Sequence, residues 1–108
     1  MNTIGNILKE HRKKNNLLIR ELAAEIEIDP ALLCKYENGY RLPTKEQINK
    51  IAEYFNININ KILTIWLSDK IVYELSDDTE NALGAMKVAE KKFKYLQAQK
   101  EKELLSNS

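Results

Sequence analysis

The sequence predicts an all-α fold, and three observations support this prediction. Leucine, isoleucine, lysine and glutamate are abundant, whereas the 108 residues include only 3 glycines and 2 prolines. Apolar residues recur at spacings of three and four, the period of an amphipathic helix, and no segment alternates as a half-buried strand would. Start and stop signals such as Asp29-Pro30 and Asn38-Gly39 bound these periodic segments. The chain has room for one domain of about 70 residues and an appendage.

The first helix is expected over residues 3–15, with one apolar face and a basic end. The second is expected over residues 18–26. Its small Ala23 lets two helices cross closely, and the rest of its inward face is apolar (Ile19, Leu22 and Ile26). These two helices precede the most informative segment of the chain.

The third helix is expected over residues 30–38, with clear signals at both ends. Asp29 can accept a hydrogen bond from the free amides of the first turn, and Pro30 has no N–H to lose there. Gly39 tolerates the left-handed conformation that ends a helix. Two short helices joined by a tight turn form a helix-turn-helix, and the second of them has the right size for a DNA major groove.

The outer face of this third helix is the predicted DNA surface. Leu33 and Tyr36 fall three apart and face inward, which leaves five residues for the outside: Pro30, Ala31, Leu32, Cys34 and Lys35. Lys35 can reach guanine O6 and N7, and the equal alternative is a phosphate contact or solvent exposure. Ala31 and Leu32 can contact a thymine methyl group, and the alternative is that they cover the edge of the core.

Two further helices follow a loop. Thr44 is expected to cap the fourth helix, with Gln47 as its capping-box partner, and the buried face of this helix is apolar (Ile48, Ile51, Ala52 and Phe55). Asn56 or Asn58 ends it, and Asn58 can cap the fifth helix. The fifth helix is apolar nearly all round, as far as Leu75. A helix at the edge of a small domain gives one face to its own core, so its other sides must also be covered.

The final helix is expected over residues 79–104. Its apolar residues keep a four-three-four-three spacing, which is typical of a coiled-coil seam (Ala82, Met86, Ala89, Phe93 and Leu96). We expect a second subunit, this C-terminal helix, or both to cover the fifth helix. The predicted dimer interface is Ile62, Trp66, Met86 and Phe93, with the domain core as the alternative place for Trp66. The sequence thus predicts a DNA-binding domain over residues 1–67 and a dimerising extension over residues 68–108.

Composition and motifs argue against other classes of protein. A net charge of +1 leaves room only for a local basic footprint. The single cysteine, Cys34, cannot form an internal disulfide, and we interpret it as a small residue rather than a redox switch. With no apolar run of membrane length and no secretory segment, the chain is expected to be cytoplasmic, with no membrane partner. We find no catalytic set, phosphate-binding loop or metal-ligand cluster, and His11 has no partner ligand. We therefore expect no enzyme activity, no metal and no cofactor.

Residues 4–67 resemble the Cro/CI-type, or XRE, helix-turn-helix family of transcription regulators. The resemblance rests on several motifs together: Gly5-x-x-Leu8-Lys9-x-x-Arg12, Leu22-Ala23, Leu33-x-x-Tyr36-Glu37-Asn38-Gly39, Arg41-x-Pro43-Thr44 and Ile51-Ala52-x-x-Phe55. It implies a five-helix, lambda-repressor-like DNA-binding domain, here with an additional long C-terminal helix.

The resemblance also implies roles for residues of the site. The five outer residues of the third helix occupy positions that face bases in the family. Asn38, Tyr40 and Arg41 lie where the family contacts phosphate. Glu37 occupies a position from which it pairs with Arg12 of the first helix.

Two residues depart from the family pattern. Ile19 stands where the family usually has Gln beside a phosphate, so one contact is lost. Glu27 stands where the turn usually has Gly, and a left-handed backbone at a non-glycine residue costs about 1 kcal/mol.

These observations predict a sequence-specific transcription regulator that binds double-stranded DNA as a homodimer on a near-palindromic operator. The C-terminal part is similar to a subgroup that accompanies restriction-modification genes. The prediction therefore includes control of such genes, and a contact with RNA polymerase. The alternative is an antitoxin-like module that binds a protein partner and autoregulates its operon, although the apolar seam better suits self-association.

Overall fold

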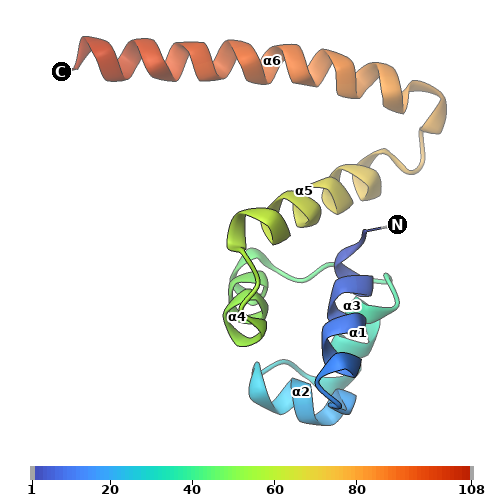
Figure 1. The fold of residues 1–108 in the computed structure, drawn as a ribbon. Helices are drawn as coiled ribbons and strands as arrows, with labels where there is room; N and C mark the ends of the chain where they lie inside the picture. The colour runs from blue at the N-terminus through green and yellow to red at the C-terminus, as the bar shows by residue number, and fades with distance from the viewer. Residues whose placement is uncertain (1, 108) are drawn as a thin grey trace. The chain divides into compact units, whose positions relative to one another are not determined.

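The computed structural model describes residues 2–107, which form six helices and no strand (Figure 1). The helices are α1 (Ile4–Lys14), α2 (Ile19–Glu25), α3 (Pro30–Glu37), α4 (Lys45–Phe55), α5 (Ile59–Leu75) and α6 (Thr79–Ser106). The predicted all-α class, with a long C-terminal helix, is confirmed, and every predicted helix is present. The outermost residues of the two predicted domains, 1 and 108, lie outside the described residues.

The chain divides into two compact units, residues 1–73 and 74–108. The division falls in the last turn of α5, so the boundary predicted after Leu67 lies inside a helix. Within residues 2–107, no helix combines the length and the apolarity needed to cross a membrane. The first unit contains the helix-turn-helix, and the second consists mainly of α6.

All five helices contribute to the core of the first unit. Its most deeply buried side chains are large and aliphatic: Ile4, Leu8, Leu22, Leu33, Ile48, Ile51 and Ile62. Burying one side chain of this size contributes about 1.5–3 kcal/mol. Within this unit α3 packs against both α1 and α2, and Figure 1 shows α1 and α3 side by side. The core therefore determines how α3 is presented at the surface.

Gly5 allows α1 and α3 to approach each other closely. A Cβ atom at this position would lie 2.7 Å from the backbone oxygen of Glu37 and 2.8 Å from that of Tyr36. Both distances are shorter than real Cβ contacts, and backbone atoms cannot turn away as a flexible side chain can. The absence of a side chain at Gly5 thus sets the distance between α1 and the end of α3.

Left-handed residues follow four of the helices. The φ angles are 56° at Asn16, 55° at Glu27, 76° at Gly39 and 54° at Asn56. After α3, the amides of Gly39 and Tyr40 donate to carbonyl oxygens of the last helical turn at 3.2 and 2.9 Å, which is the Schellman arrangement. The left-handed backbone predicted at Glu27 is confirmed, and so is the predicted role of Gly39.

The predicted capping residues of the next two helices are also confirmed. Thr44 Oγ1 accepts a hydrogen bond from the Gln47 amide at 3.2 Å, and Gln47 Oε1 accepts one from the Thr44 amide at 2.9 Å. Asn58 Oδ1 accepts hydrogen bonds from the amides of Asn60 and Lys61 at 3.0 and 3.2 Å. These caps fix where α4 and α5 begin.

Candidate nucleic-acid interface

The helix-turn-helix consists of α2 and α3, joined by a short turn. Asp29 Oδ2 accepts a hydrogen bond from the Leu32 amide at 3.1 Å, and Pro30 occupies the first position of α3. Ile28 is buried in the turn, and Leu33 and Tyr36 are buried along the inner face of α3. The start of α3 and its rotation about its own axis are therefore both as predicted.

The outer face of α3 contains the residues predicted to contact bases. Pro30, Ala31, Cys34 and Lys35 are exposed, and their spacing places them on one side of the helix. Leu32 is half-buried and packs against the core, so only part of its side chain belongs to this face. The structure therefore brings four of the five predicted residues together and places the fifth at their edge.

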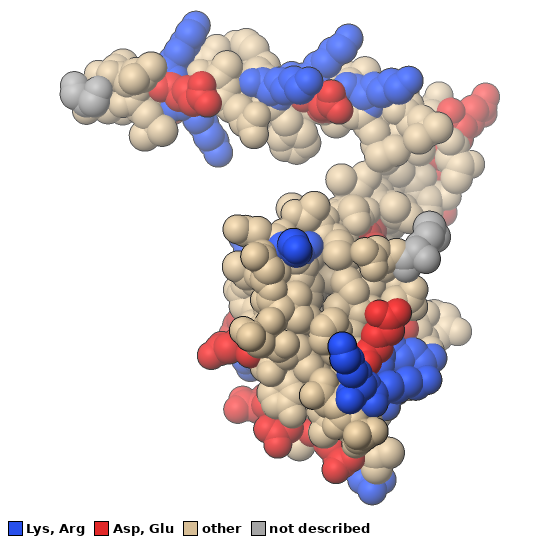
Figure 2. Space-filling model, in the orientation of Figure 1, with Lys and Arg blue, Asp and Glu red and all other residues tan. Residues whose placement is uncertain are grey.

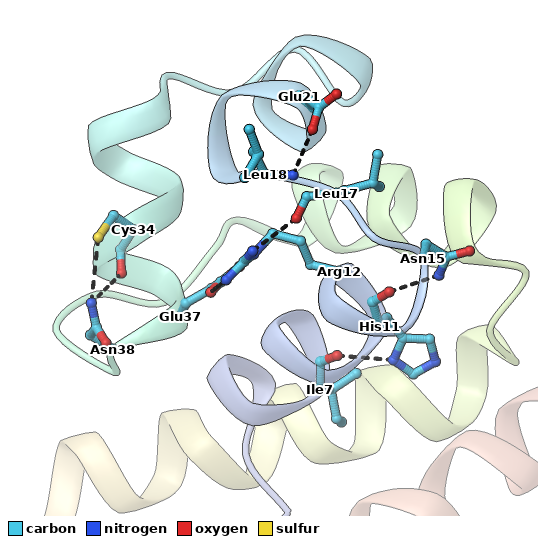
Figure 3. Close-up of polar contacts among 10 residues, drawn as sticks. All are labelled: Ile7, His11, Arg12, Asn15, Leu17, Leu18, Glu21, Cys34, Glu37 and Asn38. Carbon is cyan, nitrogen blue, oxygen red and sulfur yellow. Dashed lines mark hydrogen bonds and ion pairs between the residues drawn. The ribbon is translucent and has the colours of Figure 1, made fainter.

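A buried ion pair holds the C-terminal end of α3 against α1 (Figure 3). Arg12 Nε and Nη2 donate to the Glu37 carboxylate at 2.7 and 3.0 Å, and Arg12 Nη1 donates to the Leu17 carbonyl at 2.9 Å. Only 13% of the Arg12 side chain and 4% of the Glu37 side chain are exposed. The hydrogen bonds to Glu37 raise the pKa of Arg12 above its ordinary value, although burial acts in the opposite direction. The pairing implied by the family resemblance is thus confirmed.

A second polar contact joins α3 to α4. The Tyr36 hydroxyl donates to Gln47 Oε1 at 2.7 Å, and the same oxygen accepts the amide of Thr44. The sequence predicted Gln47 only as a capping partner, and its contact with Tyr36 was not predicted. Its effect is to fix α3 relative to the start of the next helix.

The residues predicted to contact phosphate lie directly after α3. Asn38, Tyr40 and Arg41 are all exposed, and 75% of the Tyr40 surface is accessible. The side-chain amide of Asn38 donates to the Cys34 carbonyl at 3.0 Å and approaches Cys34 Sγ at 3.4 Å (Figure 3). Asn38 thus helps to end α3, whereas Tyr40 and Arg41 extend from the loop that follows.

The predicted dimer interface requires a correction. Ile62 and Trp66 lie in the core of the first unit, where 1% and 7% of their surfaces are exposed. Their assignment to a dimer interface was wrong, because their own core already covers the face of α5 that carries them; the alternative core position of Trp66 is confirmed. Met86 and Phe93 of α6 are 39% and 64% exposed, and their role in a dimer stays a prediction.

Positive charge near the helix-turn-helix is local. Figure 2 shows basic and acidic side chains next to one another on the visible face of the first unit. Lys35, Arg41 and the basic last turn of α1 supply cations, whereas α2 and its turn are rich in acids (Glu21, Glu25, Glu27 and Asp29). Within residues 2–107, no three His, Cys, Asp or Glu side chains form a group that could hold a metal ion.

Two residues of α5 support the site in ways that the sequence analysis missed. Asp69 Oδ2 accepts a hydrogen bond from the Ile4 amide at 2.8 Å and so caps α1 from a position 65 residues away. No local pattern signals such a contact. Trp66 Nε1 donates to the Pro43 carbonyl at 2.8 Å. The sequence did carry a signal for this second contact, because the N–H group of a buried tryptophan needs a hydrogen-bond acceptor.

Comparison with known proteins agrees with this geometry. The helix-turn-helix family HTH_3 matches residues 8–62. The chain is also 36% identical over 86 residues to the cryptic phage CTXphi transcriptional repressor RstR of Vibrio cholerae serotype O1, and the match covers 71% of this chain and 77% of the relative. That share of the chain exceeds the segment that the family matches, so the similarity extends beyond it. No solved structure gives a significant match. The chain belongs to the Cro/CI-type (XRE) helix-turn-helix family of DNA-binding transcription regulators.

Proposed function

We propose that this chain is a sequence-specific transcriptional repressor that binds operator DNA as a homodimer. The observation that carries the proposal is the exposed outer face of α3, which is held in place by buried residues on its inner face and by the pair of Arg12 and Glu37. The name of RstR describes a transcriptional repressor, which favours repression over activation.

Base recognition is assigned to the outer face of α3. Lys35 has a long stem and a charged end that can donate to guanine O6 and N7, and such a contact discriminates between bases by about 1–3 kcal/mol. Ala31 and the exposed part of Leu32 suit the methyl group of thymine. Pro30 and Cys34 complete the face as small residues that let the helix approach the bases.

Phosphate binding is assigned to the segment after α3. Arg41 supplies the positive charge, and Tyr40 and Asn38 supply polar groups beside it. Each neutralised phosphate releases counterions, so affinity should fall steeply as salt increases.

The dimer is assigned to α6. Its apolar side chains, including Met86 and Phe93, are exposed, and a second copy of the same helix can cover them. Two recognition helices related by a two-fold axis would read half-sites about 34 Å apart, which makes the operator a near-palindrome. We include in the proposal a cytoplasmic location and a contact with RNA polymerase. Control of restriction-modification genes would be supported by adjacent methyltransferase and endonuclease genes.

The test is selection of duplexes from a random pool by the full chain, followed by binding measurements on the selected duplex. We expect a near-palindrome. Lys35→Ala should weaken binding to it by about 1–3 kcal/mol and relax the preference at one base pair of each half-site. Lys61→Ala, at an exposed lysine in the first turn of α5, is the matched control and should leave the preference unchanged.

Arg41→Ala should act differently in the same assay. It should weaken all sequences similarly and reduce the salt slope by about one unit per subunit. If Lys35→Ala also lowers binding to every sequence equally, Lys35 contacts phosphate, and specificity comes from Ala31, Leu32, Cys34 or DNA shape. A pool without enrichment and a flat salt response would rule out the proposed function.

A further inference from the structure

One face of α5 presents three side chains to other parts of the first unit. Trp66, Asp69 and Tyr73 are spaced by three and four residues, which places them on the same side of a helix. The first and last are two turns apart, about 10 Å along the helix axis. Asp69, in the middle, caps α1 through the Ile4 amide.

The outer two residues hold the two ends of the loop after α3. Trp66 Nε1 donates to the Pro43 carbonyl at 2.8 Å, and this bond is buried. The Tyr73 hydroxyl donates to the Gly39 carbonyl. The first and last residues of the loop from Gly39 to Pro43 therefore each accept a hydrogen bond from the same face of α5.

The residues between these bonds are the ones assigned to phosphate binding. Tyr40 and Arg41 are exposed, and a cavity of about 160 Å³ lies against the loop, lined in part by Gly39, Arg41, Asp69 and Tyr73. A cavity offers no packing atoms, so packing on that side of the loop is incomplete, although Leu42 is half-buried and Pro43 is buried. The two hydrogen bonds from α5 therefore add to this partial packing in holding the loop.

The two ends are held differently. The Gly39 amide is already bonded to the last turn of α3, so the Tyr73 bond to its carbonyl sets the direction in which the chain leaves that helix. Trp66 is buried, whereas 47% of the Tyr73 surface is exposed. Tyr73 is also the last residue of the first unit, directly before the segment that leads to α6.

We propose that Tyr73 is a positioning residue that holds the Gly39–Pro43 loop in the conformation in which Arg41 reaches phosphate. Trp66 anchors the other end of the loop. This inference rests on the proposed DNA-binding function, and it makes the end of α5 part of the DNA site although Tyr73 itself touches no DNA.

The first test compares Tyr73→Phe with wild type in the full chain, on the duplex that wild type selects from a random pool. The change removes one hydroxyl and keeps the ring. Loss of one hydrogen bond should weaken binding about threefold to tenfold. Tyr54→Phe is the matched control, because this exposed tyrosine makes no hydrogen bond through its hydroxyl to any residue between 2 and 107, and its affinity should stay within about twofold of wild type. Wild-type affinity of Tyr73→Phe would overturn the proposal.

A double-mutant cycle with Arg41→Ala separates positioning from a general structural role. If Tyr73 acts by placing Arg41, adding Tyr73→Phe to Arg41→Ala should weaken binding by less than about twofold. If the two losses multiply fully, Tyr73 acts on something other than Arg41, and the proposal is wrong. A loss of thermal stability in Tyr73→Phe would accompany fully multiplied losses. Such a loss would not by itself make the effect of Tyr73→Phe disappear in the Arg41→Ala background.

Amide hydrogen exchange of the DNA-free protein gives an independent measurement. In Tyr73→Phe, the hydrogen-bonded amides of Gly39 and Tyr40 should exchange several-fold faster, while the core amides of α1 and α4 keep their protection. Unchanged exchange in the loop would contradict the proposal. If wild type selects no duplex, the proposed function fails, and the exchange rates still decide whether Tyr73 holds the loop.

Discussion

The two units of this chain are both helical, but the first buries its large apolar side chains and the second leaves them exposed. The first unit encloses large aliphatic residues from all five of its helices, together with Trp66. In the second unit α6 has no buried residue, and its leucines and aromatic residues are exposed. The first unit therefore has its own source of stability, whereas the second has apolar surface that no other part of the same unit covers.

This difference has a physical consequence for α6. A long helix without tertiary packing is only marginally stable in water, because most helical stability in proteins comes from burial of an apolar face. The seam from Ala82 to Leu96 supplies such a face. We therefore expect α6 to be stable as a partner of a second copy, and the first unit to be stable in its own right.

Two aromatic substitutions, one in each unit, should give the largest difference in effect on stability and self-association. Trp66→Ala should destabilise the first unit by about 3–5 kcal/mol, because it empties a packed site and removes the bond to the Pro43 carbonyl. Phe93→Ala should leave the unfolding of the first unit nearly unchanged and weaken self-association instead. Chemical denaturation and sedimentation of both variants would check this. Equal losses of stability would mean that the two units do not differ as we describe.

The ion pair inside the first unit should have an effect of similar size. Arg12→Ala leaves the Glu37 carboxylate buried without its partner and should cost about 3–5 kcal/mol of unfolding free energy. Lys13→Ala, at the exposed neighbouring position, is the control and should change stability by less than about 0.5 kcal/mol. Replacing both partners, Arg12→Met with Glu37→Leu, should restore most of the loss.

The sign of the pH dependence follows from the raised pKa of Arg12. A group whose pKa is higher in the folded than in the unfolded state contributes its full stabilisation at pH values below its unfolded-state pKa. This contribution is lost only as the pH rises through the folded-state pKa. Stability of wild type should therefore show no loss from this pair across neutral pH. A loss under 1 kcal/mol for Arg12→Ala would contradict the stabilising role that we assign to this buried pair.

Two glycines provide the smallest and most closely matched comparison of the units. Gly5→Ala should destabilise the first unit by about 1–3 kcal/mol, because the new Cβ would meet backbone oxygens of α3. Gly84 of α6 has no such neighbour within 4 Å, so Gly84→Ala should stabilise the helix by about 0.5–1 kcal/mol. Thermal unfolding by circular dichroism measures both. A destabilising Gly84→Ala would show that α6 packs closely against another helix at this residue.

The sequence was sufficient where the determinants are local. Asp29, Pro30 and Gly39 predicted the limits of α3, and Thr44 and Asn58 predicted two further helix starts, because capping depends on neighbouring residues alone. The family pattern added the pairing of Arg12 with Glu37. It also indicated that Glu27 would need a left-handed backbone.

The sequence was insufficient where the determinants are distant in the chain. Ile62 and Trp66 were assigned to a dimer interface because an all-round apolar helix does not reveal which of its sides its own core covers. The contacts of Asp69 with Ile4 and of Tyr73 with Gly39 join segments far apart, and a single sequence contains no periodic signal for them. The fold was therefore predictable, whereas the support that α5 gives to the DNA site was not.

The central claim is that a second copy of the chain covers the apolar seam of α6. Sedimentation equilibrium of the full chain at tens of micromolar tests this most directly. We predict twice the chain mass of 12.6 kDa for wild type, with dissociation toward the single-chain mass in Phe93→Ala. A wild-type protein that sediments as a single chain throughout this concentration range would contradict the claim.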